Sequence, residues 1–451
     1  MKTILIPERA QRIIDLLEAA GHSAYVVGGC VRDALLGRAP NDWDITTSAR
    51  PAQVKDVMAA AGLPTVDTGI AYGTVTVLVD GEPFETTTFR SDGTYSDGRH
   101  PDEVRLLDAI DGDLARRDFT VNALAYNPHV GLVDLFGGQA DLAAGILRCV
   151  GEPSARFGED ALRILRGLRF AAQLGFTLEE GTAAAIHADR ALLSQVSAER
   201  IAAELAKLVR APHMVSVLLD YADVIAAVLP EIEPSIGFDQ HNVHHCYTVW
   251  EHCVRAASAA PADDLVLRYA ALFHDIGKPA CFFRGDDGQG HFYGHRDVSA
   301  DLFACIAKRL KLPRKLASQV EVLVRYHDAN PPTTAKGMRH WALKFGPDTV
   351  RQIFQIHRCD VSALSPEEVA PALGNIDAME AFFEESIAEV RVFGKRDLAV
   401  NGRDLLELGI PQGPGIGRVL DALLEAVVDG ELPNERAALL ECARELAGAQ
   451  G

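Results

Sequence analysis

Two aspartates one residue apart follow a glycine turn near the start of the chain. The segment GGCVRDALLGRAPNDWDITT begins at Gly28 and places Asp42 and Asp44 in a run rich in β-formers. Because residues i and i+2 of a strand point to one face, we expect the two carboxylates to converge. Adjacent carboxylates repel each other unless a cation joins them, and oxygen ligands of this kind suit Mg²⁺. The pair therefore predicts a magnesium site for phosphoryl or nucleotidyl transfer.

The residues around this pair favour phosphate binding. AYVVGG reads as a buried strand ending in a tight turn, and VRDALLG reads as a helix that stops at Gly37. Gly28 and Gly29 let the backbone approach a phosphate, and we expect Arg32 on the first helical turn to meet a triphosphate. The strand-like run GEPFETTTFR offers Glu85 as a third carboxylate. Taken alone, an aspartate pair on a strand is more often a solvated edge.

Further motifs follow in a fixed order. They are RSDGTYSDGRHPDEV, RRDFTVNALAY, GEDALRILRGLRFAAQLGF and SAERIAAEL. Together with the opening segment they resemble the class II tRNA nucleotidyltransferases and bacterial poly(A) polymerases, which belong to the polymerase-β-like nucleotidyltransferase superfamily. The resemblance covers roughly residues 20–210. It implies a flexible loop at 91–103 that reorients the base-reading residues as addition moves from C to A.

The RRDFTVNAL motif is expected to hold the sugar and the phosphates. By the resemblance, Arg117 binds phosphate or ribose, and Asn122 orients the turn. Asp118 would accept a hydrogen bond from the ribose 2′-OH, the group that distinguishes a ribonucleotide. The alternative is that Arg116 and Arg117 are plain surface charges.

Four charged residues recur every three positions in GEDALRILRGLRF: Asp160, Arg163, Arg166 and Arg169. This spacing predicts one face of a helix. A carboxylate can accept from the exocyclic amine that cytosine and adenine share, so Asp160 and Arg163 would select C and A without a template, as the family's matching residues do. Arg166 and Arg169 would face phosphates. The alternative is a surface helix with simple charge pairs.

The second half carries a different set of polar residues. The pair His274–Asp275 in LFHDIGK resembles the core of an HD-type metal site. The other members of the resembling set are His252 upstream and His295, His327 and Asp360 downstream; His241, His244 and His245 fit less well. Such ligands suit Mg, Mn, Ni, Co or Fe, and a bound metal would activate water for phosphoester cleavage. Hydrolysis of cyclic phosphates or 2′-phosphates on damaged tRNA ends, and a purely structural body, both remain open.

The final stretch reads as helices joined by glycine and proline turns. GPGIGRVL places glycines at a helix start, and the stretch resembles the tail of HD-bearing CCA-adding enzymes, which holds the tRNA elbow. Acidic residues outnumber basic ones here, so a tail that grips RNA should present its cations on one side. The candidates are Lys395, Arg396, Arg403 and Arg418. A simple packing bundle is the alternative.

Composition places limits on the whole chain. It has 451 residues, 8 scattered cysteines and a net charge of −19, which disfavours a general nucleic-acid binder but permits a local basic stripe. No run of residues is apolar enough to span a membrane, and we expect a cytoplasmic protein. The expected fold is α+β, with a mixed-sheet nucleotidyltransferase head at 1–127. A helical neck at 128–215, an HD-type helical body at 216–365 and a helical tail at 366–451 follow.

The motifs and the resemblance together predict a tRNA nucleotidyltransferase that adds CCA to the tRNA 3′ end from CTP and ATP with Mg²⁺. Its expected partners are the acceptor stem and elbow of tRNA and the two nucleotides, with no obligate protein partner. The alternatives are a half enzyme that adds only A or only CC, a poly(A) polymerase, an HD phosphohydrolase whose head only binds RNA, and an RNA-binding adaptor.

Overall fold

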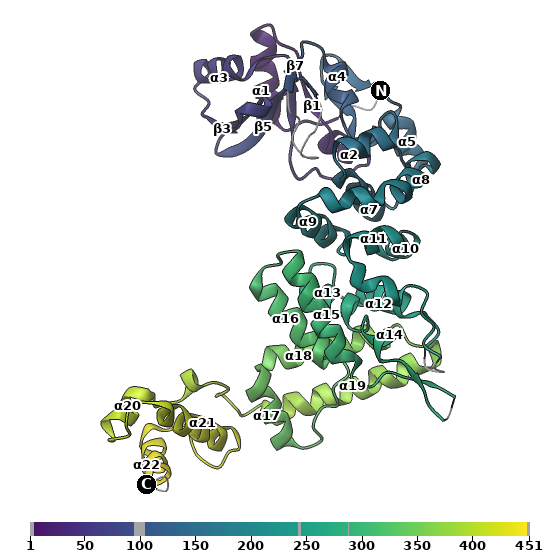
Figure 1. Cartoon of the computed structure of the whole chain (residues 1–451). Coiled ribbons are helices and arrows are strands. Elements are labelled where there is room, and N and C mark those ends of the chain that lie inside the picture. Colours follow the sequence, from purple (N-terminus) through teal and green to yellow (C-terminus); the bar gives the residue numbers. More distant parts are fainter. Residues whose placement is uncertain (1–3, 94–103, 242–244, 287, 449–451) are drawn as a thin grey trace. The chain divides into compact units, whose positions relative to one another are not determined.

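The computed structural model describes residues 4–93, 104–241, 245–286 and 288–448 (Figure 1). The chain forms two compact units, one of residues 1–233 with 309–311 and one of residues 234–308 with 312–451. Most of the expected 91–103 loop, from residue 94 on, lies outside the described residues. Among the helices that are described, none combines the length and apolar character needed to cross a membrane.

A seven-stranded mixed sheet forms the N-terminal part of the first unit. Its order is β3-β4-β5-β2-β1-β8-β9, and only β2 and β5 pair in parallel. The strands are β1 (Ala24–Val27), β2 (Ile45–Thr47), β3 (Thr65–Gly69), β4 (Thr74–Val79), β5 (Glu82–Thr88), β8 (Leu124–Asn127) and β9 (Gly131–Asp134). The mixed sheet of the predicted head is thus confirmed. Since β9 belongs to this sheet, the sheet continues past the predicted boundary at residue 127.

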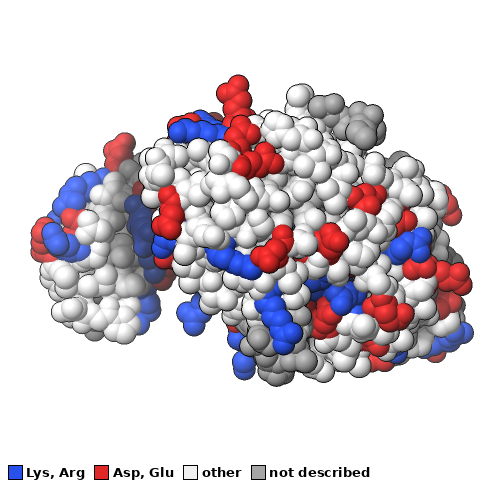
Figure 2. Space-filling view, turned by 90° about the horizontal axis from the view of Figure 1, so that it is seen from above, with Lys and Arg blue, Asp and Glu red and all other residues white. Residues whose placement is uncertain are grey.

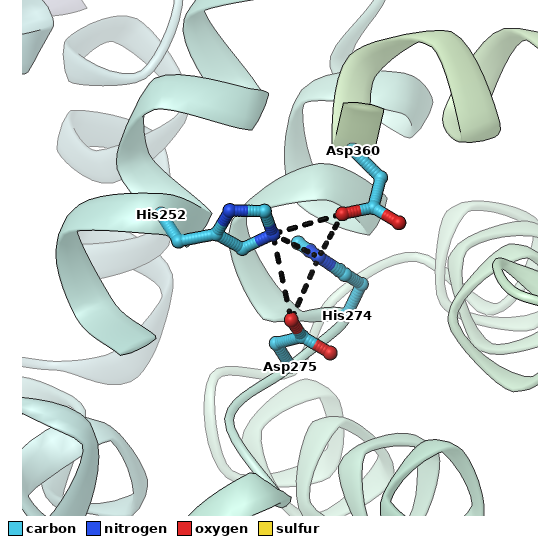
Figure 3. A group of neighbouring side chains, drawn as sticks. All are labelled: His252, His274, Asp275 and Asp360. Carbon is cyan, nitrogen blue, oxygen red and sulfur yellow. Dashed lines mark hydrogen bonds and ion pairs between the residues drawn. The ribbon is translucent and has the colours of Figure 1, made fainter. Parts of the chain in front are cut away.

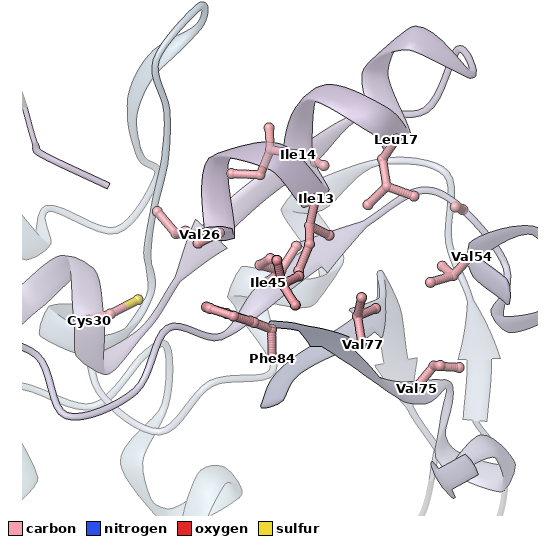
Figure 4. Packing of buried hydrophobic residues seen from close by; sticks show 14 of the residues in the cluster. Ile13, Ile14, Leu17, Val26, Cys30, Ile45, Val54, Val75, Val77 and Phe84 are labelled. Atoms are coloured by element: carbon pink, nitrogen blue, oxygen red, sulfur yellow. The ribbon is translucent and has the colours of Figure 1, made fainter. Parts of the chain in front are cut away.

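Helices cover both faces of the sheet. Helices α1 (Glu8–Ala19) and α3 (Pro51–Ala60) bury apolar side chains against one face (Figure 4). Helix α4 (Ile110–Ala115) packs on the other face. Neighbouring residues of β1 show the strand alternation, because Val26 enters the first cluster and Val27 the second. Burial of such side chains contributes about 1.5–3 kcal/mol each, so the strand that leads into the glycine turn is held firmly from both sides.

The rest of the first unit is mainly helical. It contains α5 (Gly138–Ala144), α6 (Pro153–Glu159), α7 (Leu162–Leu174), α8 (Glu180–Asp189), α9 (Ala198–Leu208), α10 (Met214–Asp220) and α11 (Ala222–Val228). Helix α7 carries Arg163, which was predicted to read the base, and Arg166 and Arg169, which were predicted to face phosphates; it packs against α9. It ends at Gly175, whose φ of 72° is the left-handed conformation that glycine adopts without strain.

The second unit is built from helices and one short hairpin. Its main helices are α12 (Val249–Ala259), α13 (Leu265–Phe273), α14 (Lys278–Cys281), α15 (His295–Arg309), α16 (Arg314–Tyr326), α17 (Ala335–Phe345), α18 (Pro347–Val361) and α19 (Pro366–Ile387). Strands β12 (Phe283–Arg284) and β13 (Gly290–His291) form the hairpin, which an all-helical body did not predict. Helix α19 shares a core with α17 and α18. The body's core therefore extends past residue 365, where we expected the tail to begin.

Helices α20 (Gly402–Glu407), α21 (Pro414–Val428) and α22 (Arg436–Gly448) make up the end of the chain. They enclose their own apolar cluster, which begins at Val392 and includes Leu405 and Leu423. The predicted glycine-rich helix start is present, because Gly413 precedes α21. The tail is therefore a small packed bundle with its own core.

Gly138 tests the packing that seats α5 on the sheet. An added Cβ there would lie 2.3 Å from the backbone oxygen of Thr120, which cannot move away cheaply. We expect Gly138→Ala to lower the free energy of unfolding by about 1–3 kcal/mol. In the matched control Gly158→Ala, the added Cβ meets nothing within 4 Å. It should raise stability by about 0.4–1 kcal/mol. Chemical denaturation followed by circular dichroism measures both, and equal effects would contradict this packing.

Candidate active site and metal centre

The two aspartates lie just before strand β2, which begins at Ile45. The expectation that both stand on the strand is therefore wrong. The backbone still continues the strand ladder, because Val27 N–H donates to the Asp44 carbonyl over 3.0 Å. Glu85 lies on β5, whose residue Thr86 pairs with Ile45. Asp44 and Glu85 thus immediately precede two paired residues of parallel neighbouring strands.

The pKa of Asp44 reflects its burial and the nearby carboxylates. Burial, together with the charges of Asp42 and Glu85, raises the pKa of Asp44 to about 6. Asp42 and Glu85 are exposed. In the described part of the chain, the carboxylate oxygens of Asp42, Asp44 and Glu85 do not all lie within 4.8 Å of one another. Burial and two neighbouring carboxylates disfavour the charged form of Asp44, and this donor set fits a divalent metal.

The glycine turn next to these carboxylates is closely packed. Gly28 has a φ of 83°, and an added Cβ would lie 2.6 Å from the Arg117 guanidinium. Arg117 also donates to the Asn122 carbonyl over 3.3 Å, so its side chain lies over the turn. Arg32 is buried and donates to Asn122 Oδ1 over 2.6 Å and to Asp33. The structure thus holds Arg32 on protein partners, where we expected it to face a triphosphate.

Asp118 links this turn to the helical part of the first unit. One carboxylate oxygen accepts from the Asn122 side chain over 3.0 Å. The other accepts twice from Arg166, over 2.6 Å and 2.8 Å. Burial alone would raise the pKa of Asp118, but the Arg166 charge outweighs it and the pKa is lowered. Arg166 is therefore paired with Asp118, whereas we expected it to face phosphate.

The base-reading pair is positioned differently from the expected helix face. Asp160 stands outside α7, and its Oδ1 accepts from the N–H of Leu162, the first residue of that helix, over 3.1 Å. Its other oxygen accepts from Arg200 over 2.7 Å. Arg163 is buried in α7 and donates to Glu159 and to the Arg116 carbonyl. The two side chains are thus fixed from several elements at the start of α7.

Arg169 completes the row on α7 and points to an internal carboxylate. It pairs with Glu204 over 2.9 Å, and its guanidinium lies 3.9 Å from the centre of the Phe170 ring. Burial lowers the pKa of Arg169 to about 10, so it stays charged at neutral pH. This placement does not indicate a role for Arg169 in phosphate binding. Arg32 and Arg166 also approach the Phe170 ring, at 5.0 Å and 5.3 Å.

Sequence reasoning missed the partners of these arginines. Arg200 and Glu204 come from SAERIAAEL, where a spacing of four residues predicts one face of a helix. Asp113 is buried and pairs with Arg116 over 2.9 Å. Apart from its place in the motif GEDALRILRGLRF, nothing in the sequence predicted that Phe170 would contact the arginines. The motifs were visible, but which charge each arginine would meet depended on helix packing.

The second unit brings together residues from three helical segments (Figure 3). His252 of α12, His274 after α13, Asp275 and Asp360 of α18 offer ligand atoms that all lie within 4.8 Å. His252 Nε2 is 3.1 Å from His274 Nε2 and 2.8 Å from Asp360 Oδ1. His274 Nε2 is 3.2 Å from Asp275 Oδ2. This is the spacing of ligands around one ion.

A second group shares Asp275 with the first. His295 Nε2 lies 3.1 Å from Asp275 Oδ1 and 3.3 Å from His327 Nε2. The two oxygens of Asp275 therefore face different sets of histidines. All six residues predicted from the second half come together, as two adjoining groups.

Each of the four histidines is oriented through its other ring nitrogen. The Nδ1 atoms lie 2.7–3.1 Å from backbone carbonyls of Ala363, Ala271, Phe292 and Val324. A proton on Nδ1 leaves the Nε2 lone pair free, and all four Nε2 atoms face the Asp275 carboxylate. Asp275 Oδ1 is buried and makes no hydrogen bond of normal geometry. Converging lone pairs and an orphaned carboxylate oxygen fit bound metal.

The surrounding charges agree with this donor set. Burial would raise the pKa of Asp275, but His274 and Lys278 lower it well below its usual value. Lys278 Nζ lies 2.6 Å from Asp275 Oδ2. The His245 ring packs 5.1 Å from His252, His241 packs against Phe282, and His244 lies outside the described residues. His252 is thus the histidine of this stretch that joins the cluster.

Comparison with known proteins places both units in a family. Residues 24–148 match the Poly A polymerase head domain, residues 175–236 the RNA and SrmB-binding site of polymerase A, and residues 303–443 the tRNA nucleotidyltransferase domain 2. A CCA-adding enzyme of Lactiplantibacillus plantarum is 36% identical over 98% of this chain and 96% of its own length.

Solved structures agree with these matches. The CCA-adding enzyme of Bacillus stearothermophilus, solved with CTP, is 29% identical with a TM-score of 0.73 over 99% of both chains. That of Thermotoga maritima, solved with tRNA_CCA, is 20% identical with a TM-score of 0.57 over 99% of this chain and 97% of its own, and shares the fold.

The head, its carboxylates and these matches define a nucleotidyltransferase with a helical C-terminal half. Membership of this class implies a divalent metal in the head. The full-length similarity is more specific: the chain belongs to the family of CCA-adding enzymes.

The raised pKa of Asp44 predicts a pH-dependent stability. The folded pKa of about 6 exceeds the unfolded value of about 3.9, so ionising Asp44 costs stability as pH rises from about 4 to about 6. With EDTA present, Asp44→Asn should therefore raise stability by about 1–2 kcal/mol above pH 6 and leave it unchanged below pH 4. Thermal unfolding across this range measures the difference. Asp56→Asn, an exposed carboxylate of α3, is the control. A pH-independent effect of Asp44→Asn would contradict the assignment.

Proposed function

We propose that the chain adds the CCA sequence to the 3′ end of tRNA from CTP and ATP. The full-length similarity to CCA-adding enzymes supports this function. The observation that carries it in the chain's own residues is the crowding of Asp44 by Asp42 and Glu85 beside the Gly28 turn. Three carboxylates next to a glycine turn suit nucleotidyl transfer.

The roles of the head residues follow from this placement. Asp42, Asp44 and Glu85 would hold Mg²⁺, which when bound stabilises the phosphates and activates the tRNA 3′-hydroxyl. The backbone at Gly28 and Gly29 would approach the triphosphate beside the Arg117 guanidinium. Arg32, through Asn122, positions the turn. Asp118 and Arg117 would lie at the ribose.

Asp160 and Arg163 retain the capacity to read a base. A carboxylate has about four acceptor sites, and Asp160 uses one on Leu162 and one on Arg200. Arg163 has five N–H donors and uses three of them on protein oxygens. The spare acceptor and donors match the amine and ring nitrogen that C and A share. Arg166 and Arg169 would position this pair through Asp118 and Glu204.

The tail is proposed to contact the tRNA elbow. Its candidate cations Lys395, Arg396, Arg403 and Arg418 are exposed. Lys395 pairs with Asp421 over 2.7 Å, so part of its charge is already neutralised. On the face that Figure 2 shows, basic and acidic side chains are interspersed over the described residues. Binding by this tail would therefore depend on a few local cations.

Incubation with a tRNA that lacks its 3′ end tests the function. With CTP alone we expect two additions, and with CTP and ATP three additions followed by arrest, read by sequencing the tRNA ends. Addition of CC only, or of A only to a CC-ended tRNA, would identify a half enzyme. A long A tail would identify a poly(A) polymerase, and no addition would overturn the proposal.

Two variants assign the activity to residues. Asp42→Ala should lower the addition rate at least 100-fold, because it removes a metal ligand. Asp56→Ala, a matched exposed carboxylate of the same unit, should leave the rate unchanged. Asp160→Ala should relax the choice of C and A over U and G. Full activity of Asp42→Ala would contradict the assignment.

We also propose that the second unit is a metal-dependent phosphohydrolase. The observation that favours it is the convergence of four histidine Nε2 atoms and the Asp360 carboxylate around Asp275. His252, His274, Asp275 and Asp360 would hold one divalent ion, and His295, His327 and the other Asp275 oxygen a second. Bound metal would supply an activated water for phosphoester cleavage. Lys278, which pairs with Asp275 over 2.6 Å, would place positive charge beside it.

Metal analysis and hydrolysis test this second activity separately. We expect elemental analysis of Mn²⁺-loaded protein to find ions that His274→Ala loses, together with its hydrolysis of 2′,3′-cyclic phosphates. The same variant should retain CCA addition, because His274 lies in the other unit. His22→Ala, a histidine remote in sequence from the cluster, is the control. Unchanged metal content in His274→Ala would exclude the site.

A further inference from the structure

The β12–β13 hairpin carries three aromatic rings that lie against one another. The Phe283 ring centre is 5.3 Å from that of His291 with an interplanar angle of 27°. His291 lies 5.7 Å from Tyr293 at 17°, and Phe283 lies 5.5 Å from Tyr293. We call these three side chains the aromatic platform.

The platform is open to solvent. Phe283 is 44% exposed and Tyr293 is 76% exposed, which puts both among the described large apolar residues with high exposure. Phe283 and His291 face each other across the hairpin register, so the short strands hold the rings in place. Grouped exposed rings on and next to these paired strands indicate a binding surface.

A pocket of about 400 Å³ joins the platform to the metal-binding cluster. Its lining includes His291 and Tyr293 of the platform and His295 of the cluster. Lys278 and Arg296 line the same pocket together with Asp297 and Asp328, and Arg296 pairs with Asp328 over 3.0 Å. Lys278 also reaches Asp275 over 2.6 Å. The pocket lining therefore combines aromatic rings with charged side chains, among them Lys278, and reaches His295, a predicted metal ligand.

This arrangement matches the chemistry of a nucleotide. Nucleobases stack on aromatic side chains, each stack being worth about 1–3 kcal/mol, and phosphates bind cations. A pocket of this volume lies in the range of small-molecule sites. A phosphoester without a base would leave the rings unused.

We propose that Phe283, His291 and Tyr293 stack a nucleobase, and that the phosphoester of the same nucleotide lies in the pocket beside His295. This inference rests on the proposed phosphohydrolase and names its substrate class: a nucleoside phosphoester, either free or at an RNA end. Hydrolysis uses one water, breaks one P–O bond and protonates the leaving oxygen. Because stacking is tolerant of sequence, all four bases should be accepted.

Paired substrates test the platform. The first pair is 2′,3′-cyclic AMP and glycerol 1,2-cyclic phosphate, which carries no base. Phe283→Ala and Tyr293→Ala should each lower kcat/KM for 2′,3′-cyclic AMP about 5- to 100-fold, mainly through KM. Both should leave kcat/KM for the glycerol substrate unchanged. Tyr293→Phe keeps the ring and should retain activity, and Leu406→Ala, an exposed apolar residue of α20, is the control.

Binding to metal-free protein gives a readout independent of hydrolysis. With EDTA present, calorimetry should show weaker binding of 2′-AMP to Tyr293→Ala than to wild type and equal binding of inorganic phosphate. CCA addition by Tyr293→Ala should be normal, which reports a folded chain. A tRNA ending in a 2′,3′-cyclic phosphate, compared with 2′,3′-cyclic AMP, shows which source of the nucleotide is preferred.

The outcomes separate the two proposals. If the wild-type protein hydrolyses neither substrate with any divalent metal, the proposed phosphohydrolase activity is overturned. The difference in 2′-AMP binding between Tyr293→Ala and wild type then still tests the aromatic platform. If wild type hydrolyses both substrates and the alanine variants lower both equally or neither, the platform is overturned and the phosphohydrolase stands. Equal 2′-AMP binding by Tyr293→Ala and wild type also overturns the platform.

Discussion

The ion pair between Asp118 and Arg166 is the contact on which the head's site depends. It joins the RRDFT turn to helix α7, and Asn122 extends it to Arg32 under the glycine turn. The elements expected to bind triphosphate, ribose and base are thus connected through one buried carboxylate. A buried ion pair is costly to break, because removing one partner leaves an uncompensated charge. The arrangement therefore fixes the site geometry before a nucleotide arrives.

Like charges and orphaned polar atoms mark both chemical centres. In the head, burial and two neighbouring carboxylates raise the pKa of Asp44. In the second unit, four imidazoles turn their Nε2 atoms towards Asp275, whose Oδ1 makes no normal hydrogen bond. A divalent cation would relieve the crowding at Asp44 and would use the Nε2 lone pairs around Asp275. The chain thus carries two candidate metal-binding centres, one in each of its two compact units.

The sequence predicted the motifs better than their contacts. The strand AYVV and the glycine turn followed from residue type and spacing, because those signals are local. The six residues of the His/Asp cluster followed from the resemblance to the HD motif set. The helix face from Asp160 to Arg169 was only partly right. Helix α6 ends at Glu159 and Asp160 has extended backbone, so the face begins at Arg163. Periodicity alone cannot locate such a break.

The partners of the arginines depended on tertiary packing. Whether Arg166 meets a phosphate or Asp118 is decided by how α7 packs on the head, and nothing in the local pattern carries that information. The Nδ1 contacts of the cluster histidines are of the same kind, because backbone carbonyls leave no trace in residue type. The aromatic platform was missed since the hairpin strands are only two residues long.

A double-mutant cycle on the Asp118–Arg166 pair tests the central claim most directly. We would measure kcat/KM for CTP addition by Asp118→Asn, Arg166→Gln and the double variant, with circular dichroism to verify folding. If the pair acts as one unit, the double variant is no slower than the slower single variant, and the coupling energy is about 2 kcal/mol. If the two losses simply multiply, the residues act independently and the pair does not join the phosphate turn to the base-reading helix.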